Sequence, residues 1–152
     1  MRKCSVRGKT LEGKYSLDYW KNTYCVEHIN DDNFHKCYSC GRIICEKITK
    51  GGVRYYDNRT VCNICRKTAV DDTAKIQKFS SIVRAKMKKW GLIINADFLP
   101  ITLANEYDIS KGNTNQLKPP CGKTKVISIS KGGIVVEKKV IDIMILYGLP
   151  SE

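Results

Sequence analysis

The sequence predicts an α+β fold, in which an N-terminal module of short β-hairpins precedes one long helix and a small β-sheet. Three observations support this prediction. Seven of the eight cysteines and both histidines lie in segment 1–67, where short apolar runs alternate with turn residues. A stretch in the middle of the chain has apolar residues at helical spacing, and the C-terminal part alternates as strands do.

The composition changes near residue 67, so we divide the chain into segments 1–67 and 68–152. The first segment contains the turn signals "NDDN", "KGG" and "DNR" between its apolar runs. That pattern is typical of small hairpins held by a metal rather than by a hydrophobic core. No internal repeat or low-complexity tract is apparent.

The second segment opens with the predicted long helix. Its apolar positions recur at intervals of three, four or seven residues, and they are Ala69, Ile76, Phe79, Val83, Met87 and Trp90. Gly91 is the stop signal. Asp71 and Asp72 suit the first turn, and the basic run "RAKMKK" suits the C-terminal end of the helix dipole.

The remainder of the chain predicts the sheet. "DFLPITLANEYDI" predicts a strand running into a short helix or turn, and "SKGNTNQLKPPCGK" predicts a loop. A hairpin turning at Lys131–Gly133 should follow, and then a last strand in "IMILYGLP".

Composition limits the classes of function. We see no signal peptide and no apolar stretch near the roughly 20 residues that a membrane helix needs, so we expect a cytoplasmic protein without membrane contact. In a reducing compartment, paired cysteines are better explained as thiolate ligands than as disulfides. The net charge of +12 favours an anionic partner, but the basic residues are spread along the whole chain.

The strongest motif is a pair of C-x-x-C sequences. Cys37 and Cys40 form the first, and Cys62 and Cys65 form the second. Two such pairs at this separation let four thiolates converge as a tetrahedron around one Zn²⁺. Because four thiolates leave no open position, the predicted site is structural. Its binding energy, on the order of 10–16 kcal/mol, could fold a segment with a small core.

A second zinc site is less regular. Cys25 and His28 form a C-x-x-H pair, and Cys4 lies upstream, but the third position after Cys4 holds Arg7. A guanidinium is always charged and cannot bind zinc. The fourth ligand could be water or one of the other candidates, which are His35, Cys45 and Cys121. The site could equally be vestigial and bind metal weakly or not at all.

These motifs together resemble the double zinc finger of LIM domains, in which consecutive ligand pairs fill two sites. The long spacer between His28 and Cys37 is similar to that in LIM-domain ubiquitin-activated zinc metallopeptidases, the family of plant organ-size regulators and their bacterial relatives. Four further segments of this sequence resemble segments of that family in the same order, and they are "YCVEH", "DNRTVCNICRKTAVDDT", "FLPITLANEYDI" and "IMILYGLP". The resemblance covers nearly the whole chain and implies a LIM-like module followed by part of a peptidase-type domain.

The resemblance also shows what this sequence lacks. In the family, the "YGLP" strand leads into a helix with the H-E-x-x-H motif, where two histidines bind zinc and the glutamate activates water. The histidines of this sequence are His28 and His35, with no such motif between them. We therefore expect no peptidase activity in this chain and regard residues 68–152 as a truncated peptidase-type domain.

Two other functions stay open. The segment "KYSLDYWKNTY" interleaves Tyr15, Tyr19, Trp20 and Tyr24 with lysines, which could serve a basic zinc-ribbon protein as a base-stacking surface. We favour packing of these rings around the first zinc site, and a zinc-binding protein with an interaction or regulatory role. The other alternative is a fragment of an active zinc metallopeptidase. The sequence indicates a protein partner without identifying it, and gives no oligomeric state.

Overall fold

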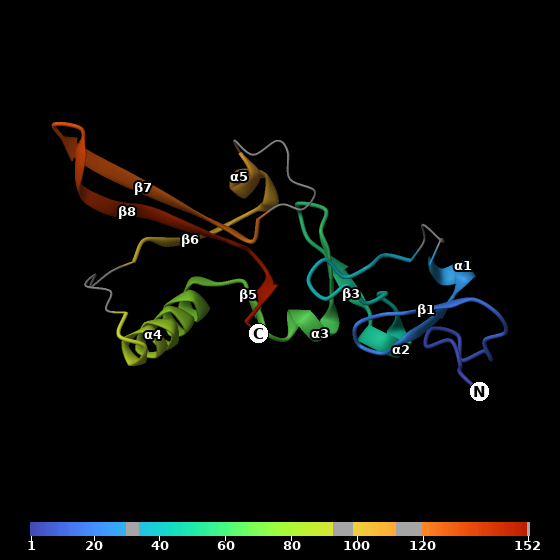
Figure 1. Ribbon diagram of the computed structural model, residues 1–152. Helices are drawn as coiled ribbons and strands as arrows, with labels where there is room; N and C mark the ends of the chain where they lie inside the picture. Colours follow the sequence, from blue (N-terminus) through green and yellow to red (C-terminus); the bar gives the residue numbers. More distant parts are fainter. Residues whose placement is uncertain (30–33, 93–98, 112–119, 152) are drawn as a thin grey trace. The chain divides into compact units, whose positions relative to one another are not determined.

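The computed structural model describes residues 1–29, 34–92, 99–111 and 120–151, which form two compact units. Unit 1 spans Met1–Thr68 and unit 2 spans Ala69–Ser151. Short hairpins and helices make up unit 1, and a helix and a small sheet make up unit 2 (Figure 1). The predicted α+β class is confirmed.

The first half of unit 1 contains a turn, a hairpin and a single helical turn. An isolated bridge between Lys3 and Thr10 closes the turn. Strands β1 (Tyr15–Leu17) and β2 (Thr23–Cys25) pair in antiparallel fashion, and α1 (Val26–Ile29) follows directly.

The second half has the same plan, with one more helical turn before its hairpin. A bridge between Lys36 and Ile43 closes its turn. The elements that follow are α2 (Glu46–Thr49), β3 (Gly52–Arg54), β4 (Thr60–Cys62) and α3 (Asn63–Arg66). β3 and β4 pair in antiparallel fashion, with Gly52 opposite Cys62 as Tyr15 is opposite Cys25.

Unit 1 is therefore an internal repeat, and the expectation of no repeat is wrong. In the first turn the N–H of Cys4 donates to Lys9 and the N–H of Gly8 to Cys4; in the second, Cys37 donates to Arg42 and Gly41 to Cys37. Gly8 and Gly41 have φ of 77° and 72°, the left-handed conformation that glycine adopts without strain.

A small core in unit 1 surrounds the second turn. Its buried members are Cys37, Val61, Cys62 and Cys65, and Tyr38, Cys40, Ile44 and Tyr55 pack against them. Tyr55, directly after β3, packs against this core, whereas Tyr56 is 72% exposed. Half of these side chains are cysteines, so this core is too small to supply ordinary hydrophobic stabilisation.

Unit 2 begins with a short strand where the sequence predicted helix. β5 (Ala69–Val70) pairs with β9 (Leu149–Pro150), and helix α4 covers Thr73–Lys89. The Asp72 carboxylate accepts a hydrogen bond from the N–H of Lys75 and caps the helix. Ala69 is buried by strand pairing rather than by a helix face, so the predicted helix starts too early.

The predicted apolar stripe of α4 is only partly buried. Ile76 is buried, whereas Val83 and Trp90 are 52% and 74% exposed. The C-terminal turn carries three lysines, and Gly91 at φ 76° follows the cap residue Trp90, as the stop signal predicted.

A three-stranded sheet, in the order β6-β8-β7, forms the rest of unit 2 (Figure 1). Its strands are β6 (Ile101–Ala104), β7 (Gly122–Lys131) and β8 (Ile134–Leu146), and α5 (Glu106–Ser110) follows β6. β6 pairs with β8 in parallel, and β7 with β8 in antiparallel fashion. Gly132 and Gly133, both at positive φ, form the predicted hairpin turn.

The predicted break between the hairpin and a last strand is absent. Residues 134–146 form one continuous strand, because β7 pairs with β8 from Ile134 to Ile145 while β6 pairs with the other edge of β8 from Ile143 to Leu146. The predicted "NDDN" turn at residues 30–33, residues 97–98 of the strand segment and residues 112–119 of the predicted loop lie outside the described residues. Among the residues described, no helix is long and apolar enough to cross a membrane.

Candidate metal centres

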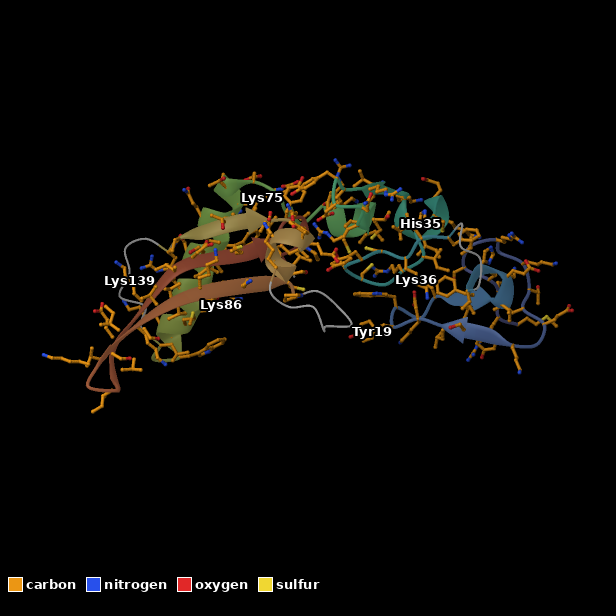
Figure 2. The ribbon with its side chains drawn as sticks, turned by 90° about the horizontal axis from the view of Figure 1, so that it is seen from above. Tyr19, His35, Lys36, Lys75, Lys86 and Lys139 are labelled. Carbon is orange, nitrogen blue, oxygen red and sulfur yellow. The ribbon has the colours of Figure 1, made fainter. Side chains whose placement is uncertain are left out.

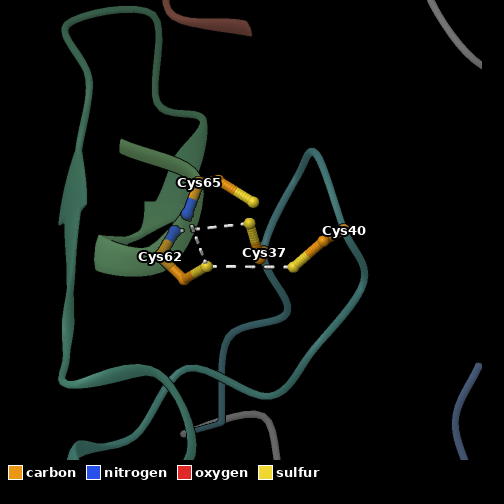
Figure 3. Close-up of side chains that lie close together, drawn as sticks. All are labelled: Cys37, Cys40, Cys62 and Cys65. Atoms are coloured by element: carbon orange, nitrogen blue, oxygen red, sulfur yellow. Dashed lines mark hydrogen bonds between the residues drawn. The ribbon is translucent and has the colours of Figure 1, made fainter. Parts of the chain in front are cut away.

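The four cysteines of the paired C-x-x-C motifs lie together in the second half of unit 1 (Figure 3). Cys37 and Cys40 lie on the turn that ends at Gly41. Cys62 is the last residue of β4, and Cys65 lies on α3. Hairpin pairing thus returns the chain to the turn and places all four sulfurs within 4.8 Å of one another. We call this cluster the four-thiolate site.

The sulfur spacing fits a tetrahedral metal. With metal–sulfur bonds of about 2.3 Å, tetrahedral ligands are about 3.8 Å apart. The sulfurs of Cys40 and Cys62 are 3.8 Å apart. Four sulfurs complete a tetrahedron and leave no open coordination position, and three of the four cysteines are buried. Such a site can hold a structure together but has no place for a substrate.

Backbone N–H groups stabilise the thiolate form of Cys37. The N–H of Cys62 donates to the sulfur of Cys37 at 3.3 Å (Figure 3). Burial raises the pKa of the Cys37 thiol, but N–H groups led by that of Cys62 outweigh it, and the net pKa is lowered. Cys62 and Cys65 differ, because burial and the neighbouring sulfurs raise the pKa of their thiols.

The three ligands of the irregular motif also converge. Cys4, Cys25 and His28 lie within 4.8 Å of one another and form what we call the three-ligand site. The Nδ1 atom of His28 is 3.2 Å from the sulfur of Cys4 and 3.0 Å from that of Cys25. His28 and Cys4 are each 1% exposed, and the His28 ring packs edge-on against Phe34 at 4.7 Å between centroids.

Backbone N–H groups stabilise the thiolate form of Cys4 as they do that of Cys37. Burial raises the pKa of the Cys4 thiol, but backbone N–H groups outweigh it and lower the pKa. The backbone N–H groups of Arg7 and Cys25, which lower the pKa of Cys4, occupy the same positions in the first half as those of Cys40 and Cys62, which lower the pKa of Cys37, occupy in the second. The two sites therefore share both backbone geometry and electrostatics.

Arg7 stands where the repeat places the fourth ligand. It is the third residue after Cys4 and precedes Gly8, as Cys40 is the third after Cys37 and precedes Gly41. The guanidinium of Arg7 instead donates to the Glu27 carboxylate at 2.8 Å. Both side chains are more than half exposed, so this ion pair contributes little stability.

None of the other proposed fourth ligands joins the three-ligand site among the described residues. Cys45 is the N-cap residue of α2, and His35 is exposed. Cys121 is exposed and belongs to unit 2. All eight cysteines are free thiols in this structure.

The aromatic residues near the three-ligand site are arranged differently from the prediction. Tyr24 is buried, but Tyr19, in the loop between β1 and β2, is 88% exposed (Figure 2). Trp20 contacts the four-thiolate site instead. Its indole N–H donates to the carbonyl of Cys40 at 3.0 Å, and the Arg42 guanidinium stacks 3.7 Å from the centre of its ring.

Asp18 is a structural residue that the sequence reasoning missed. Its carboxylate accepts hydrogen bonds from the backbone N–H groups of Trp20 and Asn22, at 2.9 and 2.8 Å. The Asn22 amide and the Tyr24 hydroxyl also donate to it, at 2.8 and 2.6 Å. Aspartate readily bonds the backbone two residues on, so the D-x-W-x-N spacing was the available signal. Asp18 fixes the loop that leads into Cys25.

Comparison with known proteins agrees with the motifs. The chain is 33% identical over 69 residues to Protein DA1-related 2 of Arabidopsis thaliana, covering 43% of this chain and 12% of that protein. It is 28% identical over 139 residues to Protein DA1-related 7 of the same plant, covering 87% of this chain and 24% of that protein.

The chain thus spans less than a quarter of the length of these relatives. No family model matches the sequence, and no solved structure matches significantly. The relatives agree with the resemblance that the motifs predicted: this chain is similar to DA1-related proteins, and its two cysteine-rich sites fit a LIM-like module.

Proposed function

We propose that unit 1 is a LIM-like module that binds Zn²⁺ for structure, and that the chain acts in protein interaction or regulation without catalysis. The observation that carries this proposal is the four-thiolate site. Its sulfurs have the spacing of zinc ligands and are largely shielded from solvent. Zinc would there organise a segment whose core is too small to fold by itself.

A reducing compartment, such as the cytoplasm, suits this proposal. The eight free cysteines would stay available as thiolates there. The lowered pKa of Cys37 favours its thiolate, the form that binds zinc, whereas the raised pKa values of Cys62 and Cys65 mean that a bound metal would have to displace their protons.

The absence of catalysis rests on the composition of the sites. Of the two histidines in the sequence, His28 belongs to the three-ligand site and His35 to neither site. No H-E-x-x-H motif is present in these 152 residues. The chain spans only part of its relatives, so a longer active metallopeptidase is the alternative. Reading the gene beyond the codon of Glu152 for a helix with H-E-x-x-H separates these two possibilities.

Zinc content tests the central proposal. Elemental analysis of purified Cys40→Ser should show one zinc fewer per chain than the parent protein, together with loss of folded structure by circular dichroism. Cys121→Ser is the matched control, because that thiol is exposed and lies outside both sites. Unchanged zinc content and spectrum in Cys40→Ser would show that the four cysteines do not bind the metal.

Nucleic-acid binding is a second candidate, which one observation favours. Tyr19 is largely exposed beside Trp20, and Arg42 stacks on Trp20. Exposed rings with nearby cations are the usual features of single-strand binding. Such binding should weaken steeply with salt because counterions are released, whereas a protein contact of the LIM type should not. Fluorescence anisotropy with a labelled oligonucleotide at two salt concentrations distinguishes the two.

A further inference from the structure

The three-ligand site opens onto a pocket. The pocket has a volume of about 370 Å³ and is lined by both cysteine ligands, Cys4 and Cys25. Arg7 and Glu27 line the same pocket. Arg7, which stands where a fourth ligand would be, therefore does not fill the fourth coordination position. It borders a space that is large enough for a small molecule.

The charges in this pocket favour an anion. Three cations line it, Arg7, Lys9 and Lys14, against two carboxylates, Glu12 and Glu27. Neither carboxylate lies close enough to join Cys4, Cys25 and His28 as a ligand. Arg7 accounts for this in part, because it holds the Glu27 carboxylate at 2.8 Å.

We propose that the three-ligand site is an open zinc site that binds a small thiol carrying a carboxylate, with Arg7 as the counter-ion of that carboxylate. The proposal rests on the zinc-binding function proposed above. The thiol would lose its proton to solvent, and its sulfur would be the fourth ligand, in the position that Cys40 occupies in the other half of the repeat. Soft thiolates suit zinc already bound to cysteine, and a guanidinium suits carboxylates.

Cobalt provides the readout for the test. Co²⁺ takes the place of zinc in thiolate sites, and its near-ultraviolet charge-transfer absorption grows with the number of bound thiolates. The chain loaded with two Co²⁺ is titrated with mercaptoacetate. We expect a saturable gain in that absorption, while 2-mercaptoethanol binds about threefold to fivefold more weakly because it lacks the carboxylate. Acetate should produce no thiolate band.

Two variants test the role of Arg7 in opposite directions. Arg7→Met should weaken mercaptoacetate binding about threefold to fivefold and leave 2-mercaptoethanol binding unchanged. Glu27→Gln should tighten mercaptoacetate binding, because it removes the carboxylate that competes for Arg7. The four-thiolate site, which lacks an open position, is the internal control.

Each outcome decides the proposal. Two bound Co²⁺ without any spectral response to the thiols would overturn the open site while leaving zinc binding intact. A chain that binds a single Co²⁺ at the four-thiolate site would overturn both the open site and zinc binding by the three-ligand site. An equal response to both thiols, unaffected by Arg7→Met, would remove Arg7 from the site.

Discussion

Arg7 is the residue that distinguishes the two halves of unit 1. The turns around Cys4 and Cys37 have equivalent backbone hydrogen bonds and equivalent glycines. The backbone at residue 7 therefore already has the geometry that presents Cys40 to a metal. What the first half lacks is one sulfur atom, not the fold that would position it.

Substituting Arg7→Cys should therefore complete a four-ligand site. We expect zinc affinity of the three-ligand site to rise by at least about tenfold, since a direct ligand should matter no less than the outer-shell partners of a metal site. Competition with a chromogenic chelator measures this. Arg7→Ser is the control, because it removes the guanidinium without supplying a thiolate. Equal affinities in the two variants would mean that residue 7 does not face the metal.

Asp18 makes a second prediction at this scale. Burial raises the pKa of its carboxyl, but the hydrogen bonds, first that from Tyr24 and then those from Asn22, outweigh it and lower the pKa. A lowered pKa stabilises the folded state above the unfolded value of about 3.9, and that contribution is lost as the pH falls through the folded value. Asp18→Asn should cost about 1–3 kcal/mol of unfolding free energy at pH 7.

Two variants separate the charge of Asp18 from its hydrogen-bond acceptor. Parent, Asp18→Asn and Asp18→Ala proteins are compared by denaturant unfolding at saturating zinc and pH 7, because acid would release the zinc on which the fold of unit 1 depends. Asp18→Asn keeps one oxygen that can accept the backbone N–H groups, so it should lose less stability than Asp18→Ala. Glu27→Gln, on the exposed surface, is the control. Equal stability of the parent and Asp18→Asn proteins would show that the carboxylate charge contributes nothing.

At the scale of elements, helix α4 depends on its N-terminal cap. The Asp72 carboxylate accepts the N–H of Lys75 at 2.7 Å, which satisfies one of the unpaired donors of the first turn. Only Ile76 is buried on this helix, so packing compensates little for a lost cap.

Asp72→Ala should therefore destabilise unit 2 by about 1 kcal/mol. Asp72→Asn keeps a capping oxygen and should lose much less. Thermal unfolding monitored by helical circular dichroism compares the two variants. Equal destabilisation by alanine and asparagine would assign the effect to the charge near Lys75 rather than to the cap.

The elements also show how far local sequence signals reach. The spacing within each C-x-x-C motif is local and predicts each pair of ligands, whereas the hairpin of β3 and β4 brings the two pairs together. The start of α4 was predicted too early, since Ala69 pairs with Pro150, close to the other end of unit 2. The sequence predicted β8 as two strands, because local alternation does not show that β7 pairs with it along almost its whole length.

For the whole molecule, the metal should matter to one unit and not the other. Both clusters of possible ligands among the described residues belong to unit 1, residues 1–68. Loss of a structural zinc forfeits on the order of 10–16 kcal/mol, as much as the total stability of an ordinary domain.

Hydrogen exchange of Cys40→Ser should therefore show lost amide protection concentrated in residues 1–68 and retained protection in the β7–β8 ladder. Chelation of zinc from the parent protein should give the same map. Uniform loss of protection in both units would show that the whole chain unfolds together rather than unit by unit.

The repeat in unit 1 is a large-scale feature that is present in the sequence but hard to recognise there. "KCSVRGK" begins at Lys3 and its counterpart "KCYSCGR" at Lys36, whereas "TYCVEH" begins at Thr23 and its counterpart "TVCNIC" at Thr60. The two intervals are unequal, which disguises the period, and Arg7 breaks the most conspicuous motif. Backbone hydrogen bonds, which ignore side-chain identity, reveal the equivalence.

The central claim is that unit 1 holds two zinc sites, one complete and one lacking a ligand. Native mass spectrometry of the parent chain during a chelator titration tests it most directly. We expect two zinc ions per chain, with the ion at the three-ligand site leaving first and the ion at the four-thiolate site retained to much higher chelator concentration. A chain that carries no zinc, or one whose two ions leave together in a single step, would contradict the account.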